Sequence, residues 1–280
     1  QRKNWVQEKD FTIGTSRELI NGLYWGARFR YARVIPITDL NFNPEADDWF
    51  VDNEPIEFDA YNKAVINSSL TLVPFQKYMT EPNRKIVLGS KWPQFFVYYE
   101  KGVGGLLNSE INYDYAEAEI SQSFKLGTMG TSSYKVLFGK YLNTQNMYYT
   151  DYEIYPRGDQ WFFASLMESM QIQDTTLTVT DQHFRAHYAH HFNGAIINYI
   201  PFVKKLRIHV VAGASALWIK ESNYVYEEVF FGIERTFKIQ RSRFRFGIYF
   251  VAAESTNANI SPRIKFAINQ YSIRDQSWGY

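Results

Sequence analysis

Apolar and polar residues alternate along several stretches of this chain, most clearly over 184–192, 206–218 and 244–252. The even positions of the first stretch are Phe184, Ala186, Tyr188, His190 and Phe192. The odd positions of the three stretches include arginine, histidine, glycine and serine. Because successive side chains on a β-strand point to opposite faces, this period of two predicts strands with one apolar face and one polar face.

The same pattern predicts ten to twelve strands, many of them ten residues or longer, whereas soluble strands typically have about five or six. The predicted strands lie near 23–31, 60–75, 84–100, 108–126, 131–141, 160–172, 183–200, 205–220, 224–237, 241–253 and 261–271. Two long loops, 36–59 and 142–160, alternate with short connections such as the turn at 80–83. Outer-membrane barrels have long extracellular loops and short periplasmic turns, so we expect loop 36–59 outside and turn 80–83 in the periplasm.

Long strands with one wholly apolar face suit a sheet closed into a cylinder, with lipid outside and water inside. The sequence therefore predicts an all-β fold, an antiparallel transmembrane β-barrel of about twelve strands over residues 18–272. Residues 1–17 are expected to form a linker or a short first strand, and 273–280 a C-terminal tail that ends in the aromatic Tyr280. The even positions of the three stretches above should face lipid. The alternative is a soluble β-sandwich or β-propeller, because apolar and polar residues alternate along the strands of those folds as well.

Composition narrows the class of protein further. Phenylalanine, tyrosine and tryptophan make up 18% of the 280 residues, and tyrosine and tryptophan favour membrane interfaces. No apolar run is long enough for a membrane-spanning helix. A net charge of +1 gives no excess to attract nucleic acid. The chain starts at Gln1 with no visible signal peptide, so we expect a processed chain or a fragment.

Charged residues of the late strands should share the polar face. Two acidic and four basic side chains are predicted to line the lumen, namely Glu228, Glu234, Arg243, Arg245, Arg263 and Lys265. Arg243 and Arg245 should lie beside the two glutamates, while Arg263 and Lys265 lie on the next strand. Salt bridges that fix the barrel are favoured over an anion-selective passage, because paired charges largely cancel.

Neither a metal site nor a catalytic site is expected. The chain has no cysteine, and His187 and His191 would lie about 13 Å apart on a strand, too far to share a metal. The run from His190 to Gly194 resembles the His-x-Ser-Asn-Gly run of outer-membrane phospholipase. Phe192 stands where that family has its nucleophilic serine, so there is no hydroxyl to activate. We therefore expect no enzyme activity and no cofactor.

The run Tyr155-Pro156-Arg157-Gly158-Asp159 lies in the second long loop. It resembles the Arg-Gly signature of a loop in the outer-membrane assembly and translocation superfamily (Omp85-like). In that superfamily the loop folds into the lumen, and its arginine contacts the inner wall of late strands. The resemblance implies these roles for Arg157 and Gly158.

Segments between 76 and 206 resemble a family of Bacteroidota outer-membrane proteins. These segments are Gln76-Lys77-Tyr78, Gly89-Ser90-Lys91-Trp92-Pro93, Val97-Tyr98-Tyr99-Glu100-Lys101-Gly102, His191-Phe192-Asn193-Gly194 and Ile200-Pro201-Phe202-Val203-Lys204-Lys205-Leu206. Members usually carry an N-terminal carboxypeptidase-regulatory-like domain before an Omp85-related barrel. The resemblance implies that this domain, and the first strands of a sixteen-strand barrel, lie outside these 280 residues.

The sequence thus favours an integral protein of the bacterial outer membrane. Its leading function is an Omp85-like component of outer-membrane protein biogenesis or translocation, or a barrel subunit of a larger complex. A passive diffusion channel is the first alternative, and a barrel enzyme is the second. The expected partners are outer-membrane lipid, lipopolysaccharide and other outer-membrane or periplasmic proteins, but not nucleic acid.

The predicted facing can be tested with arginine substitutions. If Ile208 and Phe246 face the middle of a bilayer, Ile208→Arg and Phe246→Arg should each lower the free energy of unfolding by about 2–4 kcal/mol. Unfolding in lipid vesicles measures this loss, with Arg at Ser215 on the opposite face for comparison. Equal tolerance of Arg at Ile208 and Ser215 would contradict the assignment.

Overall fold

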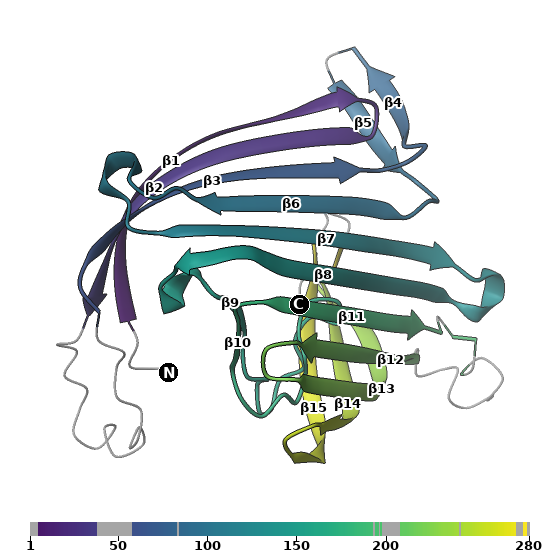
Figure 1. The fold of residues 1–280 in the computed structure, drawn as a ribbon. Coiled ribbons are helices and arrows are strands. Elements are labelled where there is room, and N and C mark those ends of the chain that lie inside the picture. The colour runs from purple at the N-terminus through teal and green to yellow at the C-terminus, as the bar shows by residue number, and fades with distance from the viewer. Residues whose placement is uncertain are drawn as a thin grey trace. The chain divides into compact units, whose positions relative to one another are not determined.

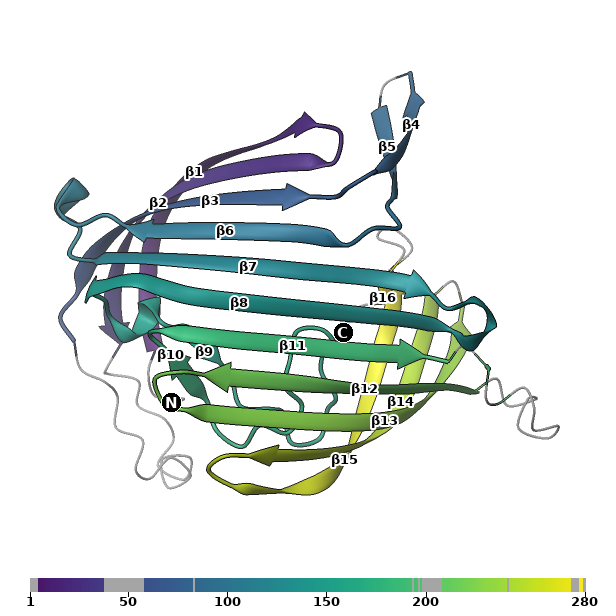
Figure 2. The same cartoon turned by 45° about the vertical axis from the view of Figure 1, so that its right-hand side comes forward.

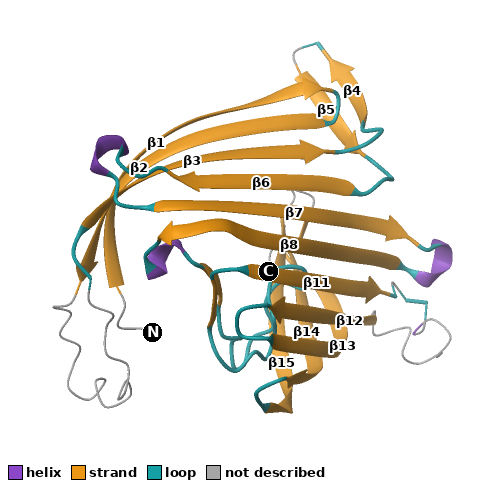
Figure 3. Cartoon of the chain, in the orientation of Figure 1, coloured by secondary structure: helices purple, strands orange, loops and turns teal. Residues whose placement is uncertain are grey.

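The computed structural model describes residues 5–37, 58–82, 84–192, 194–195, 197, 208–240, 242–272 and 277–278. Strands dominate this part of the chain (Figure 3). Its helical residues form short 3-10 turns, which are η2 (Leu106–Asn108), η3 (Gly127–Met129) and η4 (Tyr149–Asp151). Among the described residues, no helix has the length and apolar character that crossing a membrane requires. The predicted all-β class is confirmed.

Eleven long strands and the two-residue β16 form one sheet, in the order β1-β2-β3-β6-β7-β8-β11-β12-β13-β14-β15-β16 (Figure 1). Their bounds are Trp5–Ile20 (β1), Leu23–Ile37 (β2), Tyr61–Leu72 (β3), Gln94–Gly102 (β6), Asn112–Lys125 (β7), Thr131–Asn146 (β8), Gln182–His191 (β11), Ile208–Ile219 (β12), Tyr224–Ile239 (β13), Ser242–Ser255 (β14), Asn259–Ser272 (β15) and Ser277–Trp278 (β16). Two small antiparallel sheets pair β4 (Lys77–Glu81) with β5 (Arg84–Gly89), and β9 (Glu153–Tyr155) with β10 (Leu177–Val179).

The order of the described strands runs from β1 to β16 and contains no pairing between these two. A large antiparallel sheet is therefore established. Its closure into a barrel and its position in a membrane stay predictions.

The first strand begins earlier than the sequence indicated. Residues 5–20 form β1 and pair with β2 from Trp5↔Ile37 to Ile20↔Leu23, so the expected boundary between 17 and 18 is wrong. Asn21-Gly22 forms the two-residue turn, with Gly22 at φ 86°, a dihedral that glycine adopts without strain. Asn-Gly between two strands is a strong hairpin signal, and it would have identified β1.

Two other regions differ from the predicted strands. Residues 160–172 form a loop instead of a strand, with an isolated bridge at Phe162. The Ser165 carbonyl accepts from Ser169 N at 3.2 Å, as in a helical turn. The turn at 80–83 joins β4 to β5, so a separate hairpin stands between the sheet neighbours β3 and β6. Most of loop 36–59 and the terminal Tyr280 lie outside the described residues.

The chain divides into two compact units. Unit 1 comprises Gln1–Leu70, Tyr98–Ala116 and Tyr141–Asp151. Unit 2 comprises Thr71–Val97, Glu117–Lys140 and Tyr152–Tyr280. Each unit has its own apolar cluster, centred on tyrosines of β3, β7 and β8 in unit 1 and on β11 to β15 in unit 2.

Strands β11 to β14 of unit 2 lie side by side (Figure 2), followed by β15 in the sheet order, and their two faces differ in burial. The outer face is the one that presents large exposed apolar side chains, namely Val229, Phe231, Ile233, Ile248, Phe250, Ile264, Phe266 and Ile268. The inner face is the opposite one, and it carries buried tyrosines and charged residues. Large apolar side chains are thus exposed on one face, while ionisable side chains are among those buried on the other, which is unusual for a protein in water.

The predicted alternation is confirmed for β14, where Ile248 and Phe250 are exposed and Tyr249 is buried. Two even positions depart from it, because Val210 and His190 are buried. Leu206 lies outside the described residues, and Phe192 follows the end of β11.

Glycines on the inner face make room for one large ring. Tyr249 lies opposite Gly232 on β13, and a Cβ at Gly232 would lie 2.3 Å from the Tyr249 ring. A Cβ at Gly247 would lie 2.5 Å from the same ring. Since Tyr249 is fully buried and stacks on a loop residue, the ring has no space into which to move.

We therefore predict that Gly232→Ala lowers the free energy of unfolding by about 1–3 kcal/mol through overpacking. Gly104→Ala is the control, because Gly104 is exposed and its nearest contact from a Cβ would be 3.3 Å. Denaturant titration of both variants gives the two values. An equal effect at both sites would contradict the tight fit around Tyr249.

Candidate functional site

A long loop, residues 156–176, folds over the inner face of β11 to β15 in unit 2. The paired strands β9 and β10 bring its two ends together, with Tyr155 opposite Leu177. Inside the loop, Gly158 N donates to the Gln173 carbonyl at 3.0 Å. A Cβ at Gly158 would lie 2.3 Å from the Gln171 carbonyl oxygen, so this close approach requires glycine.

Apolar side chains of the loop are buried against the strands. Phe163 stacks on Tyr249, with ring centroids 3.9 Å apart and an interplanar angle of 14°. The Phe163 and Phe230 rings meet edge to face, with their centroids 5.2 Å apart. Leu166 and Ile172 belong to the same buried cluster. The loop is thus part of the core of unit 2.

A buried acid and a buried base hold the backbone of the loop. Glu228 is 2% exposed, and its Oε2 accepts from Gln171 N at 2.8 Å and Ile172 N at 3.4 Å. Lys265 is 0% exposed, and its Nζ donates to the carbonyls of Gln171, Asp159 and Phe162, the last at 3.2 Å. Hydrogen bonds to charged groups stabilise by about 1.5–3 kcal/mol each, which offsets part of the cost of burial.

The loop also pairs with the edge of β15. Phe163 N donates to the Phe266 carbonyl at 2.8 Å, and Phe266 N donates to the Trp161 carbonyl at 2.9 Å. This parallel bridge satisfies backbone groups of an edge strand that would otherwise be open to other chains.

The predicted lumen charges separate into distinct contacts. Glu234 pairs with Arg245 at 3.3 Å and accepts from the Tyr249 hydroxyl at 2.7 Å, as the sequence predicted for this pair. Glu228 does not join them, because it lies opposite Ala253 and binds the loop.

The other three basic residues of this set, Arg243, Arg263 and Lys265, make no ion pair among the described residues. Arg243 is exposed and Arg263 is partly buried. Lys265, on the same strand as Arg263, holds carbonyl oxygens of the loop instead of a carboxylate. Of the predicted lumen charges, Glu234 and Arg245 form a salt bridge, while Glu228 and Lys265 bind the loop instead.

The Arg-Gly motif behaves differently at its two residues. Gly158 is tightly packed, as described above. Arg157 is exposed, and its backbone N–H donates to Thr176 Oγ1 at 3.2 Å. The inward contact of Arg157 with late strands, which the resemblance implied, is absent from the described contacts.

The next residue, Asp159, accepts hydrogen bonds from the backbone N–H groups of Phe162 and Trp161. These bonds, that of Phe162 most strongly, hold the pKa of the Asp159 carboxyl below its usual range.

The histidines make structural contacts. His187 Nδ1 lies 2.9 Å from Ser215 Oγ, and His190 Nδ1 lies 2.7 Å from Ser132 Oγ. A hydroxyl activated by an imidazole must be reachable by a substrate, but Ser215 and His187 are both buried. Among the described residues, no three metal-ligating side chains form a group that could hold a metal.

Ser215 is buried, so it is a poor comparison for the Ile208→Arg and Phe246→Arg substitutions. Arginine at Ser215 would also lower the free energy of unfolding. Asn257, an exposed residue of the β14–β15 turn, is the better control.

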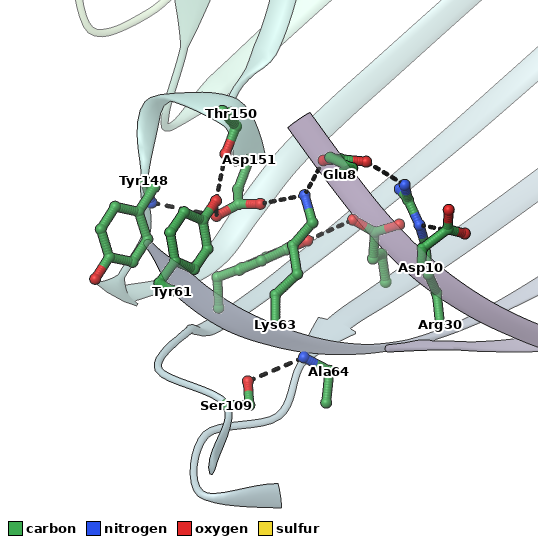
Figure 4. Close-up of polar contacts among 12 residues, drawn as sticks. Glu8, Asp10, Arg30, Tyr61, Lys63, Ala64, Ser109, Tyr148, Thr150 and Asp151 are labelled. Atoms are coloured by element: carbon green, nitrogen blue, oxygen red, sulfur yellow. Dashed lines mark hydrogen bonds and ion pairs between the residues drawn. The ribbon is translucent and has the colours of Figure 1, made fainter. Parts of the chain in front are cut away.

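Unit 1 contains a second charge cluster, in which the side chains of Lys63 and Asp151 are buried (Figure 4). Lys63 Nζ lies 3.2 Å from Asp151 Oδ1 and 3.0 Å from Glu8 Oε1. Burial raises the pKa of the Asp151 carboxyl, and the Lys63 ammonium opposes that shift. Arg30 pairs with Glu8 and also with Asp10, the latter at 3.4 Å.

The same cluster fixes the turn that follows β8. Tyr61 stacks on Tyr148 with ring centroids 3.7 Å apart, and its hydroxyl contacts Thr150. Asp151 of η4 binds Lys63 of β3. This cluster was not predicted from the sequence, because its residues are up to 143 positions apart, from Glu8 to Asp151.

These features define an all-β protein with a large antiparallel sheet and a loop held on its inner face by buried charges. A family model described as "Family of unknown function (DUF5686) C-terminal domain" matches residues 3–233. The match covers most of the chain, and the chain belongs to this family. No curated protein and no solved structure matches the chain. The Omp85-like superfamily and a carboxypeptidase-regulatory-like domain are not among the matches, so both stay predictions.

We predict that Glu228→Gln and Lys265→Met loosen the loop. Each removes a charged partner of Gln171, so backbone amides of 165–175 should exchange with deuterium faster than in the unmodified protein. The free energy of unfolding should fall by about 1.5–3 kcal/mol in each variant, because backbone groups of the loop lose hydrogen bonds to a charged side chain. Hydrogen exchange with mass spectrometry measures the first effect and denaturant titration the second.

Arg243→Gln is the control, because Arg243 is exposed and makes no ion pair among the described residues. It should change stability by no more than about 0.5 kcal/mol. Unchanged exchange of 165–175 in both test variants would show that the loop does not depend on these charges.

Proposed function

We propose that this protein is an integral outer-membrane β-barrel whose interior is filled by its own loop 156–176. We further propose that it serves as a component of outer-membrane protein biogenesis or as a barrel subunit of a larger assembly. The observation that supports the location is the exposed apolar face of β13 to β15, opposite a face with buried ionisable side chains.

Exposed apolar side chains of the outer face continue from strand to strand. Phe231 lies opposite Phe250, which lies opposite Ile264. Patches of this kind on soluble monomers rarely exceed a few hundred Å² and mark a surface that something covers. A bilayer is the covering that accepts a whole sheet face, and β13, at 16 residues, exceeds the roughly 9–11 that a tilted strand needs to span it.

The loop on the inner face supports a filled interior. Its core residues Phe163, Leu166 and Ile172 are buried, and Lys265 and Glu228 hold it from two neighbouring regions of the inner wall. An open diffusion channel needs a wide wet passage, so this loop favours an assembly role over passive transport. A steady large conductance of the unmodified protein in planar bilayers would reverse that preference.

The biogenesis role has narrower support. Loop 156–176 lies on the inner face of its strands and contains the Arg-Gly pair that resembles the superfamily's signature. Its Gly158 permits the close approach of the Gln171 carbonyl. The exposed Arg157 does not share the superfamily's inward contact. The matched family has no known function, so the role is argued from the loop alone.

Single-cysteine variants test the location, because the natural sequence contains no cysteine. We predict that cysteines at Phe231, Phe250 and Ile264 resist a membrane-impermeant maleimide in proteoliposomes. A fluorophore attached to the same cysteines before reconstitution should be quenched by nitroxide lipids. Ser222→Cys, in the exposed β12–β13 turn, should react quickly and is the matched control.

A protein that stays folded and monodisperse in buffer without detergent or lipid would contradict the proposed location. Equal maleimide rates at Phe250 and Ser222 would contradict it as well.

A further inference from the structure

The hairpin β4–β5 and its flanks, residues 75–92 of unit 2, expose an unusual density of apolar side chains. Phe75 is 76% exposed, Leu88 63% and Trp92 58%. Tyr78, Met79 and Val87 are about half exposed as well. A two-stranded hairpin is marginal in water by itself, so a surface with this composition indicates a covering partner.

The base of the hairpin is anchored. Ser90 Oγ donates to the Pro74 carbonyl and accepts from Trp92 N at 3.1 Å. Gln122 Nε2 of β7 donates to the Lys91 carbonyl at 2.8 Å. The ring centroids of Phe75 and Trp92 lie 5.5 Å apart. The aromatic base is therefore held in a defined place at the ends of the neighbouring strands.

The segment is also basic. Between residues 75 and 92 there are four basic side chains, Lys77, Arg84, Lys85 and Lys91, against the single acidic Glu81. The whole chain has a net charge of only +1, so this segment carries more positive charge than the protein as a whole. Arg84 pairs with Glu81 at 2.8 Å, and Lys85 lies over the Tyr78 ring at 4.5 Å. Lys77 and Lys91 are exposed.

The apolar surface continues into the strands on both sides. Leu72 at the end of β3 is exposed, and so are Phe95 and Val97 on β6. The hairpin thus extends the apolar face at a strand end, where aromatic and basic side chains meet lipid headgroups in membrane proteins. Anionic phosphate complements the positive charge, and the hydrocarbon boundary complements the exposed rings.

We propose that segment 75–92 is a lipid-docking element. Its base, Phe75, Leu88 and Trp92, lies at the boundary of the hydrocarbon, and Lys77 and Lys91 bind phospholipid phosphates. The sequence predicts loop 36–59 outside the cell, and the connection that carries the hairpin leaves β3 at the opposite end from that loop. We therefore propose the phospholipid leaflet and not the lipopolysaccharide one. The inference rests on the proposed function, since it requires the sheet to cross a bilayer.

Three single-cysteine variants of the full chain, each labelled with an environment-sensitive fluorophore, test this element separately from the location. They carry cysteine at Leu88 in the hairpin, at Ile233 on the outer face, and at Ser222 in an exposed turn. Each is reconstituted in phosphatidylcholine vesicles with increasing fractions of phosphatidylglycerol. The Leu88 probe should shift to the blue with increasing phosphatidylglycerol, while the Ser222 probe stays in water.

Lys77→Gln together with Lys91→Gln should raise the phosphatidylglycerol fraction for a half-maximal shift several-fold, since each basic residue near an anionic surface adds to the attraction. Both side chains are exposed, so the double variant should fold.

Loss of the Leu88 response in all lipids, with the Ile233 probe still quenched by deep nitroxide lipids, overturns the docking element alone. A Leu88 shift that does not depend on phosphatidylglycerol, or that needs lipopolysaccharide, overturns it too. Burial of the Leu88 probe in native membranes but not in pure lipid would assign the surface to a protein partner. An Ile233 probe that is not quenched refutes the proposed location itself.

Discussion

Two buried charges of opposite sign bind the backbone of one residue, and much of unit 2 follows from this contact. Glu228 accepts from the Gln171 N–H, and Lys265 donates to the Gln171 carbonyl. Neither charge has a neighbouring side chain of opposite sign within ion-pair distance among the described residues. Loop 156–176 supplies the polar groups that make burial of both side chains possible, so loop and strands are stable only together.

This contact also decides how the two faces of the sheet are used. The inner face is occupied by the loop, with Phe163 stacked on Tyr249 above glycines that leave space for the ring. Large apolar residues of the same strands must then point outward, as Phe231 and Phe250 do. A soluble sandwich would bury these residues against a second sheet, and among the described strands no second large sheet exists. The reversed faces and the internal loop are therefore two consequences of one arrangement.

Unit 1 uses the same chemistry with different residues. Lys63 binds Asp151 in the turn after β8, and Tyr61 stacks on Tyr148 in the same turn (Figure 4). The connection between β8 and β11 contains Asp151, which binds Lys63 in unit 1. Loop 156–176 of the same connection binds Lys265 in unit 2. In each unit a lysine on a strand organises a segment far away in the sequence.

The sequence by itself determined the all-β class and most strand positions, because alternation with period two follows directly from strand geometry. It placed Arg243 and Arg245 beside Glu228 and Glu234 on the adjacent strand, and of these Glu234 and Arg245 form an ion pair. It left residues 1–17 as a linker or a short first strand, although Asn21-Gly22 marked the turn of a long hairpin. It also predicted a strand at 160–172, where an apolar run forms a loop. Only the tertiary structure decided the roles of Glu228, Lys265, Lys63 and Gly158. Their partners are backbone groups or side chains brought near by folding, and a one-dimensional pattern does not contain those distances.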